Sequence, residues 1–235
     1  MNIVLLENVY REGLIERRDE RASHILKVLK LKVSDSFKLG QINGHSGTAT
    51  IERIDDEGIH YTYVKEKEKE PLYPVTLFVG QVRPICMKRI LREAVMLGVE
   101  KVIVGRTDLG EKSYENAKIW SSREYRKFLI DGAMQGGSTS ICDVDLITSL
   151  EELPLHLFDN LLLLDNILES TPLSKASLTG SILLAVGSER GFSSRERQFF
   201  VDHDFSVHSL GKRILRTETA CAVAVSLSLA AIDAL

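Results

Sequence analysis

Three short segments place polar or charged residues directly after an apolar run, and the second and third of them also contain glycine. They are residues 164–166, 186–192 and 209–218. In open α/β sheets ligands bind beyond the carboxyl ends of the strands, and glycine lets the backbone approach a ligand closely or take a positive φ. The segments therefore predict a ligand site, although such glycines also serve ordinary tight turns. None of them matches the phosphate-binding G-x-x-x-x-G-K-[ST] loop or the dinucleotide-binding G-x-G-x-x-G turn.

The third segment is the most distinctive because it places three cations within five residues. Lys212, Arg213 and Arg216 come just before the apolar run at 219–223, which is predicted to be helical. Positive charge at the start of a helix opposes the helix dipole. A solvated loop explains Lys212 and Arg213 equally well. Arg216 stands between a leucine and a threonine, where charge adds little to solubility, and it is predicted to be functional.

Two regions of different character must position these segments. The alternating charge run at 65–70 is closed by Pro71. Before it, short β-prone pieces alternate with turn residues, which is typical of a small antiparallel barrel. After it, apolar strand candidates alternate with helix candidates, which is typical of a parallel sheet covered by helices. We therefore expect a barrel at about 1–70 and an α/β domain at about 74–235.

The second region contains five predicted strands and three predicted helices. The first helix spans 87–97, the second begins at an S-x-x-E capping box and runs toward Val201, and the third runs from about Thr217 almost to Leu235. The predicted strands are residues 76–80, 99–104, 161–164, 182–186 and 205–210.

Composition narrows the class of protein further. The chain has 235 residues, 44% of them hydrophobic, and a net charge of −3, which excludes a histone-like polycation. Its three cysteines form no C-x-x-C pair, so neither a disulfide framework nor a metal site is expected. The longest apolar stretch, 220–232, is too short to cross a bilayer, and the amino terminus lacks a basic leader. A cytoplasmic location and no membrane partner are expected.

The third segment also carries a specific resemblance. Ser-Leu-Gly-x-Arg-Ile-Leu-Arg-Thr-Glu-Thr-Ala at 209–220, together with Val-Gly-x-Glu-x-Gly-Phe-Ser at 186–193, closely resembles the RsmE family. This family comprises the bacterial 16S ribosomal RNA uracil-N3-methyltransferases of the SPOUT class. Residues 24–29 and 91–98 are similar to further family segments, so the resemblance covers nearly the whole chain.

The resemblance implies a PUA-like RNA-binding barrel followed by an α/β SPOUT domain with a deep trefoil knot. It also implies a homodimer, with S-adenosyl-L-methionine bound in the knot and 16S ribosomal RNA or the small ribosomal subunit as partner. Cofactor contacts are implied for residues in all three segments, namely Leu164, Gly187, Ser188, Gly191, Leu210, Gly211, Ile214, Leu215 and Thr217.

The implied reaction needs a cation, because N3 of uracil holds a proton at neutral pH and its anion must be stabilised. We predict that Arg216 hydrogen-bonds a uracil carbonyl as negative charge grows. Glu218 or Asp165 is predicted to accept the proton or to orient the arginine. These three residues are the predicted catalytic set.

Local basic clusters agree with an RNA substrate although the total charge does not. Residues 11–32 hold seven cations against four acidic residues, and a second cluster lies at 83–92. A solvated helix face is the competing explanation for 17–21. The predicted RNA contacts are Arg11, Arg17, Arg18, Arg21, Lys27, Lys30, Arg89 and Arg213.

Several positions depart from the family pattern. Arg190 stands at a usual glycine, Lys212 at a usual proline, and Ser138 and Lys30 at usual arginines. These departures leave three alternatives: a divergent lineage with the same target, a paralogue acting on another RNA, or weaker catalysis. A non-catalytic RNA-binding or ribosome-assembly factor with this fold also remains possible. A dinucleotide-dependent dehydrogenase is disfavoured because no strand is followed by G-x-G-x-x-G.

Overall fold

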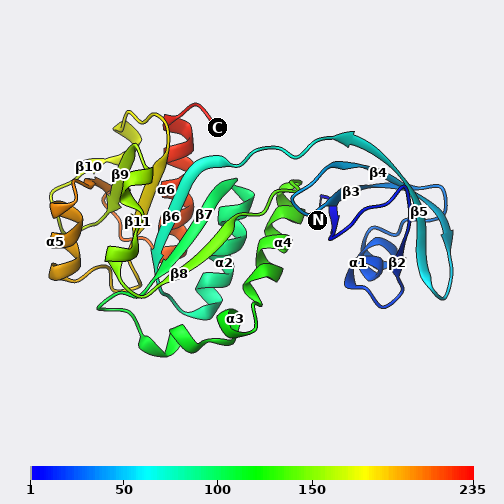
Figure 1. Ribbon diagram of the computed structural model, residues 1–235, viewed down its shortest axis with the longest axis horizontal. Helices are drawn as coiled ribbons and strands as arrows, with labels where there is room; N and C mark the ends of the chain where they lie inside the picture. The colour runs from blue at the N-terminus through cyan, green and yellow to red at the C-terminus, as the bar shows by residue number, and fades with distance from the viewer. Residues whose placement is uncertain (1) are drawn as a thin grey trace. The chain divides into compact units, whose positions relative to one another are not determined.

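The computed structural model describes residues 2–235 (Figure 1). The chain divides into two compact units. The first consists of residues 2–71 together with Ala133–Ile141, and the second of Leu72–Gly132 and Cys142–Leu235. The excursion of 133–141 into the first unit was not predicted.

The first unit is built on a five-stranded sheet with the order β1-β3-β4-β5-β2. Its inward-facing residues alternate along the strands, as in Phe37 and Leu39 or Tyr61 and Tyr63, and form one apolar core. The strands are β1 (Val4–Leu6), β2 (Glu12–Glu16), β3 (Ser36–Gln41), β4 (Ser46–Ile54) and β5 (Gly58–Lys67). A short helix α1 (Glu20–Ser23) and a π-helical turn (His24–Val28) cover the core with the buried residues Ala22 and Ile25.

One pairing in this sheet differs from the predicted antiparallel barrel. β1 pairs with β3 in parallel, whereas β2–β5, β3–β4 and β4–β5 are antiparallel. Parallel neighbours need a long crossover. Here that crossover includes β2, α1 and the π-helical turn, and short-range alternation in the sequence does not reveal it.

The segment 133–141 is an integral part of the first unit. Thr139 donates its hydroxyl to the Gly44 carbonyl at 2.7 Å, and Ser140 donates its hydroxyl to the Glu70 carbonyl at 2.6 Å. The Ile141 amide donates to the Asn43 side chain at 3.0 Å. All three donor residues are buried, so these bonds satisfy groups that water does not reach.

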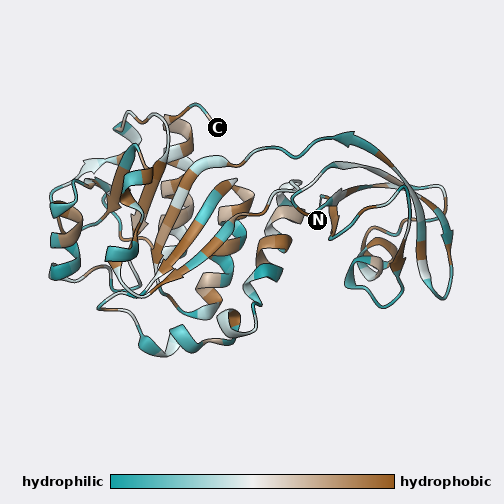
Figure 2. Ribbon diagram, viewed as in Figure 1, coloured by the Kyte–Doolittle hydropathy of each residue, from teal (hydrophilic) through white to brown (hydrophobic). Residues whose placement is uncertain are grey.

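The second unit contains a seven-stranded, all-parallel sheet with the order β10-β12-β9-β11-β6-β7-β8. Figure 2 shows hydrophobic residues along its central strands, as expected of strands covered on both faces. The strands are β6 (Tyr73–Gly80), β7 (Val99–Gly105), β8 (Asp143–Ile147), β9 (Asn160–Leu164), β10 (Thr171–Pro172), β11 (Ile182–Val186) and β12 (Ser206–Ser209).

Helices pack on the two faces of this sheet (Figure 1). Helices α2 (Pro84–Met96) and α6 (Thr217–Ala231) contact each other and the central strands. Helix α5 (Ser194–Asp202) places Phe200 in a core with Phe78 and Phe192. The remaining helices are α3 (Lys118–Ser121) and α4 (Tyr125–Gly136), with 3-10 turns at Lys112–Asn116, Leu150–Glu152, Leu155–Leu157 and Leu173–Lys175.

The mixed α/β fold, the five predicted strands and the three predicted helices of the second unit are confirmed. Strands β8 and β10 were not predicted. β8 lies at the sheet edge, and its residues Asp143 and Asp145 are exposed, so its sequence lacks a continuous apolar run. Among the described residues no helix is long and apolar enough to span a membrane.

Candidate functional site

The three segments singled out from the sequence meet at one edge of the parallel sheet. β9 pairs with β11 on one side and with β12 on the other, and all three strands run in the same direction. Leu164 is paired with Val186 and with His208, so the strands end at the same level. The loops that follow, starting at Asp165, Gly187 and Leu210, therefore leave the sheet side by side. The topology brings the predicted cofactor residues together.

The second loop is folded so tightly that Gly187 has no room for a side chain. A Cβ on Gly187 would lie 2.8 Å from the Gly191 backbone, and one on Gly80, at the end of β6, would lie 2.5 Å from the Ser188 nitrogen. Gly191 has a φ of +70°, and its amide donates to the Ser188 carbonyl at 2.9 Å. These glycines are needed because the backbones touch. Arg190, the unusual residue in this loop, is exposed.

The third loop is open. Gly211 has a φ of +110°, and a Cβ there would meet nothing within 4 Å. Ile214 is 86% exposed, an unusual state for a large apolar side chain. In the part of the chain that the structure describes, the amides of residues 211–215 have no hydrogen-bond acceptor within the protein. The loop thus offers apolar surface and free backbone donors to a ligand.

The first turn of α6 carries the predicted catalytic pair. Arg216 is the N-cap residue, is exposed, and makes no ion pair among the described residues. Glu218 is buried, and its Oε1 forms an ion pair at 3.5 Å with Nη1 of Arg89 on α2. Burial, and then the negative charge of Glu218, raise the pKa of the neighbouring Glu93 carboxyl. A cation available to a ligand therefore lies two residues before a buried carboxylate.

Asp165 has different surroundings from those expected of a catalytic carboxylate. Its side chain is only 2% exposed, and its Oδ2 accepts a hydrogen bond at 2.9 Å from Nε of Arg197 on α5. Its Oδ1 accepts hydrogen bonds from the backbone amides of Ile167 and Leu168 at 2.7 and 2.9 Å. Because both oxygens are occupied by donors of the protein, the geometry favours a structural role for Asp165 over proton transfer.

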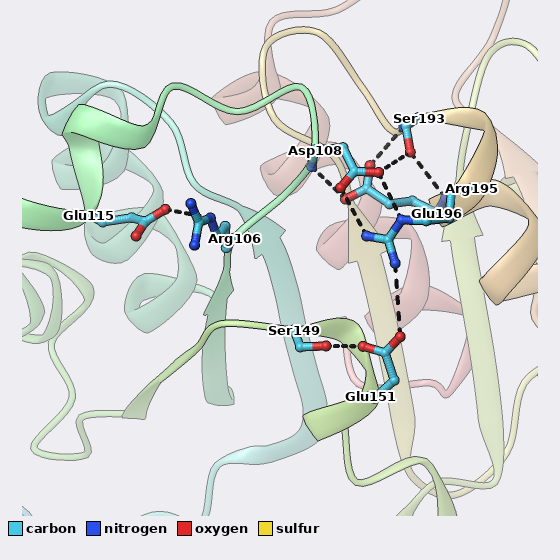
Figure 3. Close-up of polar contacts among 8 residues, drawn as sticks. All are labelled: Arg106, Asp108, Glu115, Ser149, Glu151, Ser193, Arg195 and Glu196. Carbon is cyan, nitrogen blue, oxygen red and sulfur yellow. Dashed lines mark hydrogen bonds and ion pairs between the residues drawn. The ribbon is translucent and has the colours of Figure 1, made fainter.

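Figure 3 shows how the start of α5 is fixed beside the loop after β7. Glu196 is 1% exposed; it accepts the Ser193 amide at 2.7 Å as a capping box and the Asp108 amide at 2.9 Å. Asp108 in turn accepts the Ser193 hydroxyl at 2.5 Å and the Arg195 guanidinium at 2.9 and 3.1 Å. The hydrogen bonds from Arg195, and then that from Ser193, hold the pKa of Asp108 below its usual value.

Asp108, Arg197 and Gly80 did not emerge from the sequence. The capping box at 193–196 was recognised because its partners lie three residues apart. The partners of Asp108 and Arg197 lie 87 and 32 residues away along the chain. A pattern of neighbouring residues cannot predict pairs that lie so far apart in the sequence.

The predicted RNA-binding cations fall into two groups. Arg21 is tied to Asp19 and also donates to the Leu5 carbonyl, so it stabilises the first unit itself. Over residues 2–235, the other predicted cations of this unit form no side-chain ion pair and are exposed; they are Arg11, Arg17, Arg18, Lys27 and Lys30. In the second unit Arg213 is exposed in the third loop, and Arg89 is about half exposed beside Glu218.

Comparison with known proteins shows the class of both units. Residues 68–229 match the family described as an RNA methyltransferase domain, and residues 18–60 match an RNA methyltransferase PUA domain. The second unit is thus an RNA methyltransferase domain, and the first unit is PUA-like.

Two curated relatives are more specific. The chain is 34% identical to ribosomal RNA small subunit methyltransferase E 1 of Borreliella burgdorferi, covering 94% of each chain. It is 36% identical to ribosomal RNA small subunit methyltransferase E of Treponema pallidum, covering 98% of this chain and 91% of the relative. The chain belongs to the ribosomal RNA small subunit methyltransferase E family, which confirms the resemblance found in the sequence.

Solved structures share the fold over nearly the whole chain. A ribosomal RNA small subunit methyltransferase E from Neisseria gonorrhoeae, bound to S-adenosyl methionine, superposes with a TM-score of 0.78 at 22% identity and covers 99% of this chain and 98% of its own. A predicted RNA methyltransferase from Thermotoga maritima superposes with a TM-score of 0.72 at 25% identity and covers 98% of both chains.

Proposed function

We propose that this protein transfers a methyl group from S-adenosyl-L-methionine to N3 of a uridine in 16S ribosomal RNA. The observation that carries the proposal is the edge of the parallel sheet, where three loops leave the sheet side by side and the third, which has free backbone amides, leads into the exposed Arg216. Family membership supports the reaction class.

The residues at this edge fit the cofactor. Adenine needs apolar surface and backbone hydrogen-bonding groups, which Ile214 and the amides of 211–215 offer. Gly187 and Gly191 of the second loop present only backbone to their surroundings. The proposed cofactor residues are Leu164, Gly187, Ser188, Gly191, Leu210, Gly211, Ile214, Leu215 and Thr217. When bound, the cofactor supplies an electrophilic methyl group.

The protein's own part is to prepare the uracil. In this proposal Arg216 donates to a uracil carbonyl and stabilises the negative charge that develops when N3 loses its proton. Glu218, buried two residues further along, is the carboxylate left to receive that proton or to orient Arg216, since Asp165 is occupied by Arg197. Exposed cations of the first unit hold the RNA phosphates.

Further features implied by the family stay predictions. They are the trefoil knot, the homodimer, the cytoplasmic location, and the division into a barrel at 1–70 and a methyltransferase domain at 74–235. The alternative is a catalytically weak or non-catalytic RNA-binding or ribosome-assembly paralogue with the same fold, because Ser138 and Arg190 depart from the family pattern.

The decisive experiment deletes the gene and measures nucleosides of small-subunit ribosomal RNA by mass spectrometry. The expected result is loss of one 3-methyluridine, restored by the wild-type gene and not by Arg216→Ala. Unchanged nucleosides, combined with cofactor binding by the purified protein in calorimetry, would favour the assembly factor. Absence of any cofactor binding would refute the proposal altogether.

A further inference from the structure

The buried ion pair between Asp165 and Arg197 connects two loops of the proposed cofactor site. Asp165 follows β9, and Arg197 lies in the first turns of α5, which follows the second loop. Their side chains are 2% and 12% exposed, and Nε of Arg197 lies 2.9 Å from Oδ2 of Asp165. Such a pair is well sheltered from solvent, so each charge depends on the other for compensation.

The two residues also fix the backbone of the loops themselves. Oδ1 of Asp165 holds the amides of Ile167 and Leu168, which sets the turn of the first loop. A Cβ on Gly191 would lie 3.5 Å from Nη2 of Arg197, so the guanidinium lies directly against the second loop. One guanidinium thus hydrogen-bonds the first loop and lies close to Gly191 in the second.

A third attachment anchors the arginine. Its neighbour Glu196 accepts the Asp108 amide after β7 and the Ser193 amide at the helix start. The start of helix α5 is therefore held in place by contacts other than the ion pair between Arg197 and Asp165. The spacing of the first and second loops follows from this chain of contacts.

We propose that Asp165 and Arg197 form a positioning pair that sets the spacing of the first and second loops and thereby the affinity for S-adenosyl-L-methionine. This inference rests on the proposed function. Asp165 acts through Arg197 and not on the uracil. The pair therefore governs the KM for the cofactor, whereas Arg216 in the third loop governs the chemical step.

A double-mutant cycle tests this pairing. Asp165→Asn keeps an oxygen for the amides of the first loop but removes the charge, and Arg197→Gln removes the cation. Each single variant is expected to weaken cofactor binding in calorimetry by about tenfold or more, because small displacements of binding loops are costly. The double variant should lose little more than either single variant, since the two residues act as one unit. The KM for RNA should stay unchanged.

The matched control is Asp145→Asn, which breaks an exposed ion pair with Lys101 at 3.0 Å on the same sheet and should leave cofactor affinity unaltered. Wild-type affinity in the double variant would overturn the proposal. So would a loss of kcat in Asp165→Asn with unchanged cofactor affinity, because it would make Asp165 a catalytic residue.

Hydrogen exchange on the wild-type protein provides a second test that needs no variant to fold. Saturating S-adenosyl-L-methionine should slow exchange at the amides of Ile167 and Leu168 together with those of 187–192. Protection of 187–192 alone would show that the loops are not coupled and would refute the pair. Failure of the proposed function is a separate result: the wild-type protein would then release no heat with the cofactor.

Discussion

Arg216 occupies a position that helix electrostatics alone does not favour. It is the N-cap of α6, where Ser, Thr, Asp and Asn are preferred and where the helix dipole repels a cation. It has no ion-pair partner in the described chain. A charge placed against its own helix is best explained by a ligand that carries or develops negative charge.

Replacing Arg216 by alanine should therefore lower kcat while leaving the cofactor Kd within about twofold. Removing one preorganised donor to a developing oxyanion typically costs about 100-fold or more in rate. Arg216→Lys keeps the charge but not the planar guanidinium, so its kcat should lie between those of the wild type and of Arg216→Ala. Single-turnover methylation assays and calorimetry measure these quantities, with Lys101→Ala as a charge-removal control. Activity above a tenth of wild type would refute the electrostatic role.

Arginines of the first unit are expected to separate into RNA contacts and structural residues. Arg17→Gln or Arg18→Gln should reduce the slope of log affinity against log salt by about 0.7 to 0.9, as expected for one lost phosphate contact. Arg21→Gln should instead lower the midpoint of thermal unfolding, because it removes the hydrogen bonds that Arg21 donates to Asp19 and to the Leu5 carbonyl. Filter binding across a salt series and calorimetric melting distinguish the two effects. Equal behaviour of all three variants would contradict the assignment.

At the scale of elements, the start of α5 is held both by its own capping box and by hydrogen bonds to the distant residue Asp108. Ser193→Ala removes the N-cap acceptor and the hydroxyl bound to Asp108, and it should destabilise the second unit by about 1 kcal/mol. Ser194→Ala is the matched control, since Ser194 is exposed and its hydroxyl has no partner in the described structure. Urea unfolding followed by the fluorescence of Trp120, the single tryptophan, reports the difference. Equal stability of the two variants would refute the cap.

The same contacts make the stability of α5 sensitive to acid. Because hydrogen bonds from Arg195 lower the pKa of Asp108, the stabilisation is complete above the unfolded-state pKa of about 3.9. It is lost as the pH falls through the lower folded-state pKa. Asp108→Asn should be slightly less stable than wild type at pH 7, by less than about 1 kcal/mol because the pair is partly exposed, and this difference should shrink as the pH falls below the unfolded-state pKa. A difference that does not shrink on acidification would exclude this cause.

The elements predicted from the sequence were those whose signals are local. The apolar runs of β6, β9 and β11 and the capping box of α5 depend on neighbouring residues, and each was found. β8 was missed because it is a half-exposed edge strand. The predicted cofactor and catalytic residues lie within three short segments, whereas Arg197 gains its role from a partner 32 residues away.

At the scale of the whole molecule, the order along the chain conceals which residues fold together. The charge run at 65–70 marks the end of the first stretch of the first unit, but residues 133–141, which begin within helix α4, belong to that unit again. The segment's buried residues Thr139, Ser140 and Ile141 satisfy backbone and side-chain groups of the first unit. A domain boundary predicted from composition misses this segment, because the segment is short.

The return of 133–141 predicts that a fragment ending at residue 71 is incomplete. At about 1 kcal/mol for each net hydrogen bond, losing the bonds of Thr139, Ser140 and Ile141 should cost the fragment about 3 kcal/mol. Fusing residues 133–141 to the fragment through a flexible Gly/Ser linker should restore much of this stability. Far-UV circular dichroism during thermal unfolding compares the two fragments, and a fusion with 133–141 in scrambled order serves as control. If all three melted at the same temperature, the segment would contribute nothing to the fold of the first unit.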